Sequence, residues 1–245
     1  MKPEIPSTLI NTLRQARYIA VLTGAGISAE SGVPTFRDAQ TGLWTKYHPE
    51  DLATPEAFRR DPKLVWDWYE WRRELVAKAE PNAGHIALAT LARHVPKLTL
   101  ITQNIDGLHQ RAGSRDVIEL HGNLFRNKRL RDSVIVEHHE DTGETPPRCP
   151  QTGDLLRPDV VWFGEMLPLR ALRDAQIAAT NCDVFFSIGT STLVQPAAEL
   201  PFTALHNNAV VVEINPKTTP LSEHAHYSLH GAAGQILPLI ASSLD

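Results

Sequence analysis

The chain contains four apolar runs, and each leads into glycine or polar residues. They span residues 18–23, 97–102, 183–189 and 209–215. Runs of this length and composition are typical of strands in a parallel sheet that is covered on both faces. Helix-like stretches separate them, and an alternation of strand and helix indicates an α/β fold. We therefore expect a doubly wound, Rossmann-like parallel sheet.

The remaining elements follow from the same patterns. A further short strand is expected over residues 116–120, and Ser7 is expected to cap the first helix. The expected helices cover residues 7–16, 62–79, 85–94 and 169–180, and the stretch from residue 231 to the end.

Two regions interrupt the alternation. Residues 33–60 are rich in Pro, Thr, Asp and aromatic side chains, which is typical of a ligand-covering loop with a short helix. Residues 123–160 are polar and rich in proline, and they predict a small insertion module. We therefore expect two domains. The larger comprises residues 1–33, 79–121 and 163–245, and the smaller, discontinuous one comprises residues 34–78 and 122–162.

Composition and charge exclude several functions. The net charge is −4 and no basic run is present, which argues against a general affinity for nucleic acid. No segment approaches the roughly 18 uninterrupted apolar residues of a membrane-spanning helix, and no secretion signal is expected. The two cysteines, Cys149 and Cys182, do not make a disulfide framework. A cytoplasmic enzyme or binding protein, without nucleic-acid or membrane partners, is expected.

The first apolar run leads into a glycine-rich turn. Gly24 and Gly26 with Ala29 fit the Gly-x-Gly-x-x-Gly/Ala pattern, in which the backbone and a following helix start approach a phosphate. A dehydrogenase would next show a strand that ends in an acidic residue about 20 positions later, and this chain does not. Asn215, at the end of the last run, is therefore our candidate for the adenine ribose contact. The alternative is a tight turn without a ligand.

Six short motifs are spread along nearly the whole chain. They are Gly24-Ala-Gly-Ile-Ser28, Pro34-Thr-Phe-Arg-Asp38, Thr102-Gln-Asn-Ile-Asp106, Leu120-His-Gly122, Val161-Trp-Phe-Gly-Glu165 and Gly189-Thr-Ser191. Together they resemble the motifs of the sirtuins, which are NAD-dependent protein lysine deacylases. The resemblance implies that NAD is a consumed co-substrate and that acyl-lysine proteins are the partners. Free lysine, nicotinamide and an acyl-ADP-ribose would be the products.

The resemblance also implies a catalytic set. His121 matches the family's catalytic histidine, and an imidazole with an ordinary pKa of about 6.5 is largely neutral near pH 7. Asn104 and Asp106 would line the nicotinamide ribose, because alternate residues of an extended chain face one side. The alternatives are a plain strand-end histidine and a plain turn at Asp106.

The other NAD contacts implied by the resemblance lie mostly at strand ends. Arg37 would contact the pyrophosphate, because a guanidinium matches phosphate oxygens, and Phe36 would lie near the leaving group. A surface salt bridge is the alternative for Arg37. The complete expected set is Gly24, Ala25, Gly26, Ser28, Phe36, Arg37, Gln103, Asn104, Ile105, Asp106, Gly189, Thr190, Ser191, Asn215 and Ala233.

Tyr69 and Arg72 predict the kind of acyl group. Residues three apart on a helix share a face, so a hydroxyl and a guanidinium there could bind a carboxylate together. The Tyr-x-x-Arg pattern matches the sirtuins that remove succinyl, malonyl or glutaryl groups, and a buried arginine without an anion is costly. Ala53 would leave space for such an acyl chain. The alternative is a helix whose aromatic side chains simply pack and whose arginines are solvated.

The substrate peptide would lie along the segment that contains Val161, Phe163 and Gly164. The resemblance implies backbone pairing there with an extended peptide, a form of strand addition. An ordinary edge strand is the alternative.

The chain departs from the family at its metal site. Most sirtuins hold a structural zinc with two Cys-x-x-Cys pairs, and here those positions are Arg129 and Asp132, then Cys149 and Thr152. A substitute set of Cys149, Asp132, His138 and His139 follows no known template. We therefore expect no zinc, and a module held by packing and an Arg129–Asp132 ion pair.

Two other function classes use the same features. One is an NAD glycohydrolase or ADP-ribosyltransferase with the same pocket, and the other is a non-catalytic NAD-binding protein. The favoured function is an NAD-dependent deacylase that acts on succinyl- or malonyl-lysine and more weakly on acetyl-lysine.

Overall fold

The computed structural model describes residues 4–34, 46–137 and 143–244. Within them, six strands form one parallel sheet in the order β3-β2-β1-β7-β8-β9. The strands are β1 (Tyr18–Thr23), β2 (Lys97–Thr102), β3 (Ile118–Glu119), β7 (Val184–Ile188), β8 (Val210–Asn215) and β9 (Tyr227–His230). The predicted doubly wound parallel sheet is confirmed.

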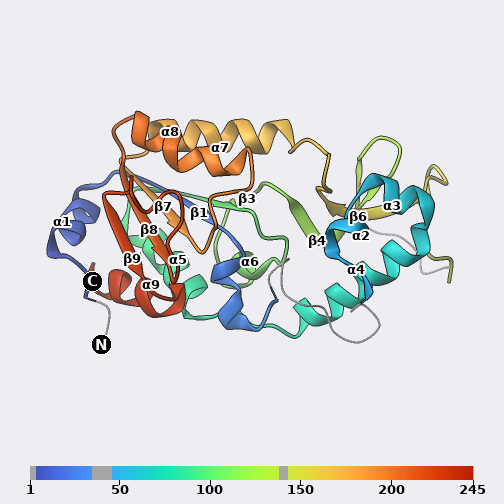
Figure 1. Ribbon diagram of the computed structural model, residues 1–245, viewed down its shortest axis with the longest axis horizontal. Helices are drawn as coiled ribbons and strands as arrows, with labels where there is room; N and C mark the ends of the chain where they lie inside the picture. Colours follow the sequence, from blue (N-terminus) through green and yellow to red (C-terminus); the bar gives the residue numbers. More distant parts are fainter. Residues whose placement is uncertain (1–3, 35–45, 138–142, 245) are drawn as a thin grey trace.

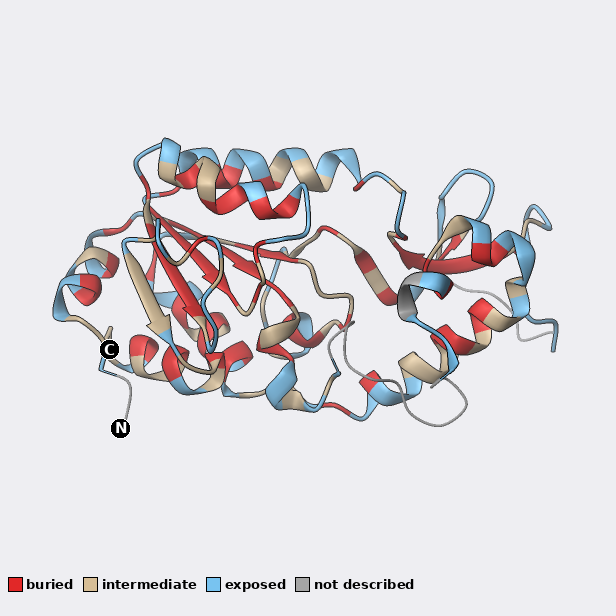
Figure 2. Ribbon diagram, in the orientation of Figure 1, coloured by how far each residue is buried: buried red, intermediate tan, exposed pale blue. Residues whose placement is uncertain are grey.

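Helices cover both faces of this sheet (Figure 1). Helices α1 (Ser7–Gln15), α5 (Ala83–His94) and α9 (Ala233–Ser242) share one core cluster, and α7 (Leu169–Asn181) and α8 (Leu200–His206) share the other. Along β1, Ile19 and Val21 pack into the first cluster, whereas Ala20 and Leu22 pack into the second. Successive side chains of a strand point to opposite faces, so both faces of β1 are buried. Figure 2 colours the central strands of this sheet mostly as buried.

The strand order reverses beside β1. From β1 the chain continues to β2 and β3 on one side, and later returns to β7, β8 and β9 on the other side. In open α/β sheets, ligands bind outside the carboxyl ends of the strands at such a reversal. The ends of β1 and β7 are therefore the expected place for a ligand.

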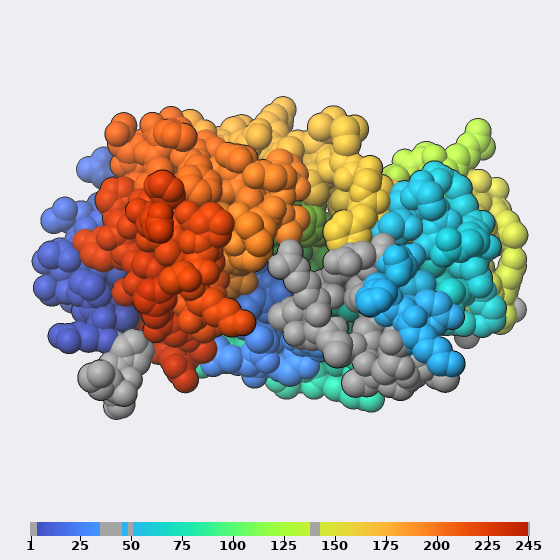
Figure 3. Space-filling model, in the orientation of Figure 1, coloured from blue at the N-terminus to red at the C-terminus, as the bar shows by residue number. Residues whose placement is uncertain are grey.

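A second group of elements lies at one end of the molecule, and helices α1 and α9, the first and last of the chain, lie at the opposite end (Figures 1 and 3). We call this group the small domain, and we call the six-stranded sheet with its helices the large domain. The helices of the small domain are α2 (Pro49–Leu52), α3 (Pro55–Arg60) and α4 (Pro62–Ala77). Its strands form an antiparallel sheet in the order β5-β4-β6, and they are β4 (Gly122–Arg129), β5 (Ile135–Val136) and β6 (Leu156–Val160).

The helices of the small domain begin at well-defined residues. The Thr54 side chain accepts a hydrogen bond from the Ala57 N–H at 3.0 Å, and the Asp61 side chain accepts one from the Leu64 N–H at 3.0 Å. Each cap is followed by a proline at the first helical position, where the missing N–H costs nothing. These caps fix the start of α4, the helix that carries Tyr69 and Arg72.

Several predictions of detail were wrong. Ser7 does not cap α1, because the N-cap residue is Pro6 and no side-chain cap bond forms. The strand expected over residues 116–120 shortens to Ile118–Glu119, and the helix expected to reach residue 79 ends at Ala77. The region 123–160, predicted only as a small insertion module, contributes the antiparallel sheet. The domain boundaries remain a proposal.

No helix in the described ranges is long and apolar enough to cross a membrane.

Candidate functional site

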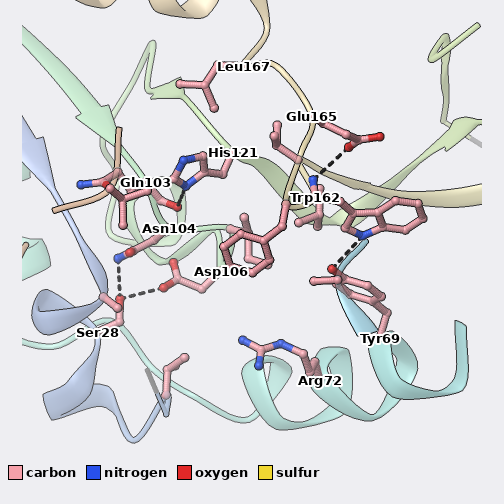
Figure 4. Close-up of a pocket in the computed structure, with 18 of the residues that line it drawn as sticks. Ser28, Tyr69, Arg72, Gln103, Asn104, Asp106, His121, Trp162, Glu165 and Leu167 are labelled. Carbon is pink, nitrogen blue, oxygen red and sulfur yellow. Dashed lines mark hydrogen bonds between the residues drawn. The ribbon is translucent and has the colours of Figure 1, made fainter. Parts of the chain in front are cut away.

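A cavity of about 360 Å³ lies where the end of the large sheet meets the small domain. Figure 4 shows its side chains, with Gln103, Asn104 and His121 on one side and Tyr69, Arg72 and Trp162 on the other. The cavity brings together every residue predicted for catalysis or substrate binding, although these residues come from distant parts of the sequence. They are Tyr69, Arg72, Asn104, Asp106, His121, Val161, Phe163 and Gly164.

The glycine turn after β1 packs directly against the turn after β7. The Gly24 N–H donates to the Ile188 carbonyl at 3.0 Å, and the Gly26 N–H donates to the Gly189 carbonyl at 2.8 Å. A Cβ on Gly26 would lie 2.7 Å from the Gly189 Cα. Glycine is thus required here by contact between two backbones at the reversal of strand order, and not only by approach to a ligand.

The helix start expected after this turn is replaced by two short 3-10 turns. They are η1 (Ala25–Ile27) and η2 (Ala29–Ser31), and η2 ends at Gly32 with a left-handed φ of 76°. An anion here would therefore be met by local N–H groups of a turn, without the dipole of a long helix.

Replacement of Gly26 by alanine is expected to lower the melting temperature by about 2–12 °C. Overpacking costs about 1–3 kcal/mol, and each kcal/mol shifts the melting temperature of a chain of this size by about 2–4 °C. The affinity for NAD should fall as well, since the turns after β1 and β7 would both shift. Gly189→Ala should cost more, because Gly189 also has a φ of 60°. Calorimetry and an NAD titration measure both effects, and an unchanged melting temperature in both variants would refute this explanation of the glycines.

A hydrogen-bonded group of side chains fixes the floor of the cavity. The Ser28 hydroxyl donates to the Asp106 carboxylate at 2.7 Å, and the Asn104 amide donates to the Ser28 hydroxyl and to the Gly24 carbonyl, both at 3.1 Å. The second Asp106 oxygen accepts from the Leu108 N–H at 2.9 Å. Asp106 therefore does stabilise a turn, as the alternative supposed, while it also lines the cavity.

His121 has a defined tautomer. Its Nδ1 lies 2.9 Å from the carbonyl oxygen of Gln103, and because a carbonyl can only accept, Nδ1 carries the proton. The other nitrogen, Nε2, is then the basic one. Burial lowers the pKa of His121 below its ordinary value, against the opposing effect of the Gln103 bond. The imidazole is therefore neutral near pH 7 and can accept a proton at Nε2.

Two further histidines, His85 and His109, lie buried behind the cavity, and sequence reasoning missed them. His85 Nε2 lies 3.5 Å from the Ser28 hydroxyl, and His109 Nε2 lies 2.8 Å from the Thr23 hydroxyl. Burial lowers their pKa values to about 4 and about 3, respectively, so both are neutral. Nothing in the pattern of eleven histidines marks these two, because the hydroxyl groups they meet, on Ser28 and Thr23, are far away in sequence.

Other residues of the predicted NAD-binding set, Gly189, Thr190, Ser191 and Asn215, lie along the same strand-end edge, outside the cavity. The Gln103 amide donates to the Thr190 hydroxyl at 3.0 Å, and the Asn215 amide donates to the Thr190 carbonyl at 2.8 Å. Gly189 and Ser191 flank Thr190 in this turn. Ala233 begins α9 with its side chain in the core, so a contact with adenine would come from its backbone. Phe36 and Arg37 lie outside the described residues.

The side chains of Tyr69 and Arg72 both reach the cavity. The Tyr69 hydroxyl accepts a hydrogen bond of 2.9 Å from the Trp162 indole N–H, and burial raises the pKa of Tyr69 to about 12. Burial also lowers the pKa of Arg72, although a guanidinium stays charged in proteins. The adjacent Arg73 donates instead to the Leu124 carbonyl at 2.7 Å and to Asn127 at 2.6 Å. The alternative in which both arginines are solvated is wrong.

The segment predicted to pair with a peptide already uses three of its N–H groups. Val161 donates to the His121 carbonyl at 3.0 Å, and Phe163 donates to the Ala53 carbonyl at 2.9 Å. The Trp162 N–H donates to the Glu165 carboxylate at 2.9 Å. Strand addition would therefore involve Gly164 and the carbonyl groups of this segment.

The positions that hold zinc in most sirtuins do not suit a cation. Arg129 donates to the Asp132 carboxylate through two hydrogen bonds of 2.9 and 2.6 Å, which confirms the predicted ion pair. A guanidinium at a ligand position repels a metal ion. Cys149 packs against Trp66 and Leu156. The described ranges contain no group of three or more His, Cys, Asp or Glu residues that could hold a metal, and His138 and His139 lie outside them.

We expect purified protein to contain far less than one zinc atom per chain, and its melting temperature to be unaffected by a chelator. Elemental analysis and calorimetry with and without EDTA measure this. Stoichiometric zinc, or a fall in the melting temperature after chelation, would overturn the prediction.

Comparison with known proteins gives matches over the whole fold. The Sir2 family model matches residues 24–196. The NAD-dependent protein deacylase of Methylococcus capsulatus is 52% identical over 98% of each chain. NAD-dependent protein deacylase 1 of Pseudomonas aeruginosa is 49% identical over 94% of this chain and 95% of the relative.

Solved structures are similar as well. A crystal structure of a Sir2 homolog–NAD complex is 45% identical, with a TM-score of 0.91 over 99% of this chain and 94% of that chain. A Sir2–p53 peptide–NAD+ structure is 31% identical, with a TM-score of 0.85 over 98% of both chains.

Proposed function

The chain belongs to the Sir2 family and is an NAD-dependent protein deacylase, and we propose that it removes succinyl and malonyl groups from lysine in preference to acetyl. The observation that carries the acyl preference is the placement of Arg72 and Tyr69 in the same cavity as His121. A carboxylate at the end of an acyl chain would meet a cation and a hydroxyl there.

The strand-end edge fits a dinucleotide. The close-packed turns after β1 and β7 lie at the reversal of strand order, where such ligands bind. We propose that Gln103, Asn104 and Asp106 hold the nicotinamide and its ribose, because amide and carboxylate groups match a carboxamide and sugar hydroxyls. The turn at Gly189–Ser191 and Asn215 would hold the adenosine part. When bound, NAD supplies an electrophilic ribose carbon and nicotinamide as a leaving group.

His121 is proposed as the general base. Its Nδ1 is fixed by the Gln103 carbonyl, so its Nε2 is free to take a proton from a ribose hydroxyl. Burial favours the neutral imidazole, which is the form that acts as a base. Asn104, held by Ser28 and Gly24, would orient the ribose rather than exchange protons.

The far end of the cavity is suited to an acidic acyl chain. Arg72 is charged and largely removed from water, so a carboxylate beside it is favoured over a neutral acetyl group by a charge-assisted hydrogen bond. Ala53 is small and lines the same cavity, which leaves room for the chain. Acyl-lysine proteins are the proposed partners, bound along the segment at Val161–Gly164.

The test uses three peptides of one sequence that carry acetyl-, succinyl- or malonyl-lysine. We expect kcat/KM for the succinyl and malonyl peptides to exceed the acetyl value by at least about tenfold, the effect of one charge-assisted hydrogen bond. Mass spectrometry should detect acyl-ADP-ribose. A higher rate on the acetyl peptide would refute the acyl preference. Nicotinamide release without any peptide would instead indicate an NAD glycohydrolase.

A further inference from the structure

Trp162 connects the loop after β6 to α4 by one hydrogen bond. Its indole N–H donates to the Tyr69 hydroxyl oxygen at 2.9 Å, and both side chains are buried (Figure 4). An indole nitrogen can only donate, whereas a phenol oxygen can accept and donate at once. The direction of this bond is therefore fixed, and Tyr69 keeps its own hydrogen for another partner.

The indole is held so that its N–H cannot turn elsewhere. The guanidinium carbon of Arg157 lies 3.3 Å from the centre of the Trp162 ring. Arg157 in turn donates to the Glu165 carboxylate at 2.6 and 2.9 Å, and Glu165 accepts from the Trp162 backbone N–H at 2.9 Å. The ring of Phe58 packs with its centre 5.3 Å from the indole. Backbone and ring of Trp162 are thus both fixed.

The bond determines which side of the Tyr69 hydroxyl presents its hydrogen. Because the Trp162 N–H approaches the oxygen from one side, the hydroxyl hydrogen is repelled from that side and points away from the indole. Burial raises the pKa of Tyr69 to about 12, so this hydrogen is present at neutral pH. An acyl carboxylate in the cavity would therefore meet a donor.

We propose that Trp162 is a positioning residue for acyl selectivity: by donating to Tyr69, it keeps the phenol hydrogen directed at a carboxylate that is bound by Arg72. This inference rests on the proposed preference for acidic acyl groups. Without the indole N–H, the hydroxyl can rotate and present a lone pair, which repels a carboxylate. An acetyl group has no distal carboxylate, so its turnover does not depend on this orientation.

The test is the ratio of kcat/KM for succinyl- and acetyl-lysine peptides of one sequence. It is measured in the wild type, Trp162→Phe, Tyr69→Phe and the double variant. Phenylalanine keeps an aromatic ring beside Arg157 and removes the N–H. We expect the ratio to fall about 3- to 10-fold in Trp162→Phe, the range for one net hydrogen bond. It should fall at least as far in Tyr69→Phe, and no further in the double variant, because Trp162 acts through the hydroxyl.

Trp66→Phe is the matched control. Trp66 lies on α4 as Tyr69 does, but it packs against Cys149 and Leu156 rather than lining the cavity. Its loss should leave the ratio at the wild-type value. A partly unfolded variant loses both activities alike, so the ratio separates selectivity from stability.

An unchanged ratio in Trp162→Phe, or losses that add in the double variant, would overturn the inference. The proposed function fails in a different way. A wild type without acyl preference, or a preference that survives Arg72→Met, contradicts both. A preference that depends on Arg72 and Tyr69 but not on Trp162 contradicts this inference alone.

Discussion

Replacement of His121 by alanine is expected to lower the deacylation rate by about 10²- to 10⁴-fold, the usual contribution of a positioned general base. NAD binding should persist, because the side chains of Gln103, Asn104 and Asp106 are held by partners other than this imidazole. Single-turnover kinetics and an NAD titration measure the two quantities. His206→Ala, an exposed position in the last turn of α8, is the control and should keep full activity.

The pH dependence of the wild type provides a second readout of the same residue. Burial lowers the pKa of His121, so the neutral, active form persists below the ordinary histidine value of about 6.5. Activity should therefore fall on the acid side only at a pH below 6.5, and the His121→Ala variant should lack this step. A rate in His121→Ala close to that of the wild type, or the same acid-side step in its pH profile, would contradict the assigned role.

Replacement of Arg72 by methionine is expected to reduce the preference for succinyl over acetyl peptides by about 10- to 150-fold, because a hydrogen bond to a charged group contributes about 1.5–3 kcal/mol. Methionine fills a similar volume without charge, so the loss should come mainly from the succinyl peptide. Acetyl turnover should change much less. Steady-state kinetics with the two peptides measure the ratio.

Arg73→Met is the control for this prediction, since it makes the same change one position along α4. Its guanidinium is bound to Leu124, Asn127 and Glu70, so its loss should lower stability but leave the acyl preference intact. Equal effects of the two variants on the ratio would show that the helix, and not the Arg72 charge, determines selectivity.

The large sheet could be predicted closely from the sequence because both of its faces are buried. Unbroken apolar runs mark such strands, and β1 and β2 have the predicted limits. The small antiparallel sheet could not be predicted, because β4 and β6 carry buried charges that neutralise each other. The buried Lys128 lies 3.4 Å from the buried Asp159 carboxylate, which the exposed Arg126 also contacts at 2.9 Å. In a sequence, charged residues predict an exposed segment, even where the fold pairs them across strands.

In the candidate site, too, some features could be predicted from the sequence and others could not. Motif residues such as His121, Asn104 and Arg72 could be placed at strand ends and on one helix face, and the structure brings them to one cavity. The residues that fix them could not be predicted. Trp162 and Tyr69 are 93 positions apart, and His85 reaches Ser28 only through the packing of α5. Contacts of this kind leave no periodic signal.

The most direct measurement is a crystal structure of the protein with a succinyl-lysine peptide and ADP-ribose. We predict the succinyl carboxylate at about 3 Å from the Arg72 guanidinium and the Tyr69 hydroxyl, with a ribose hydroxyl at similar distance from His121 Nε2. A carboxylate in solvent, or a ribose turned away from His121, would contradict the account.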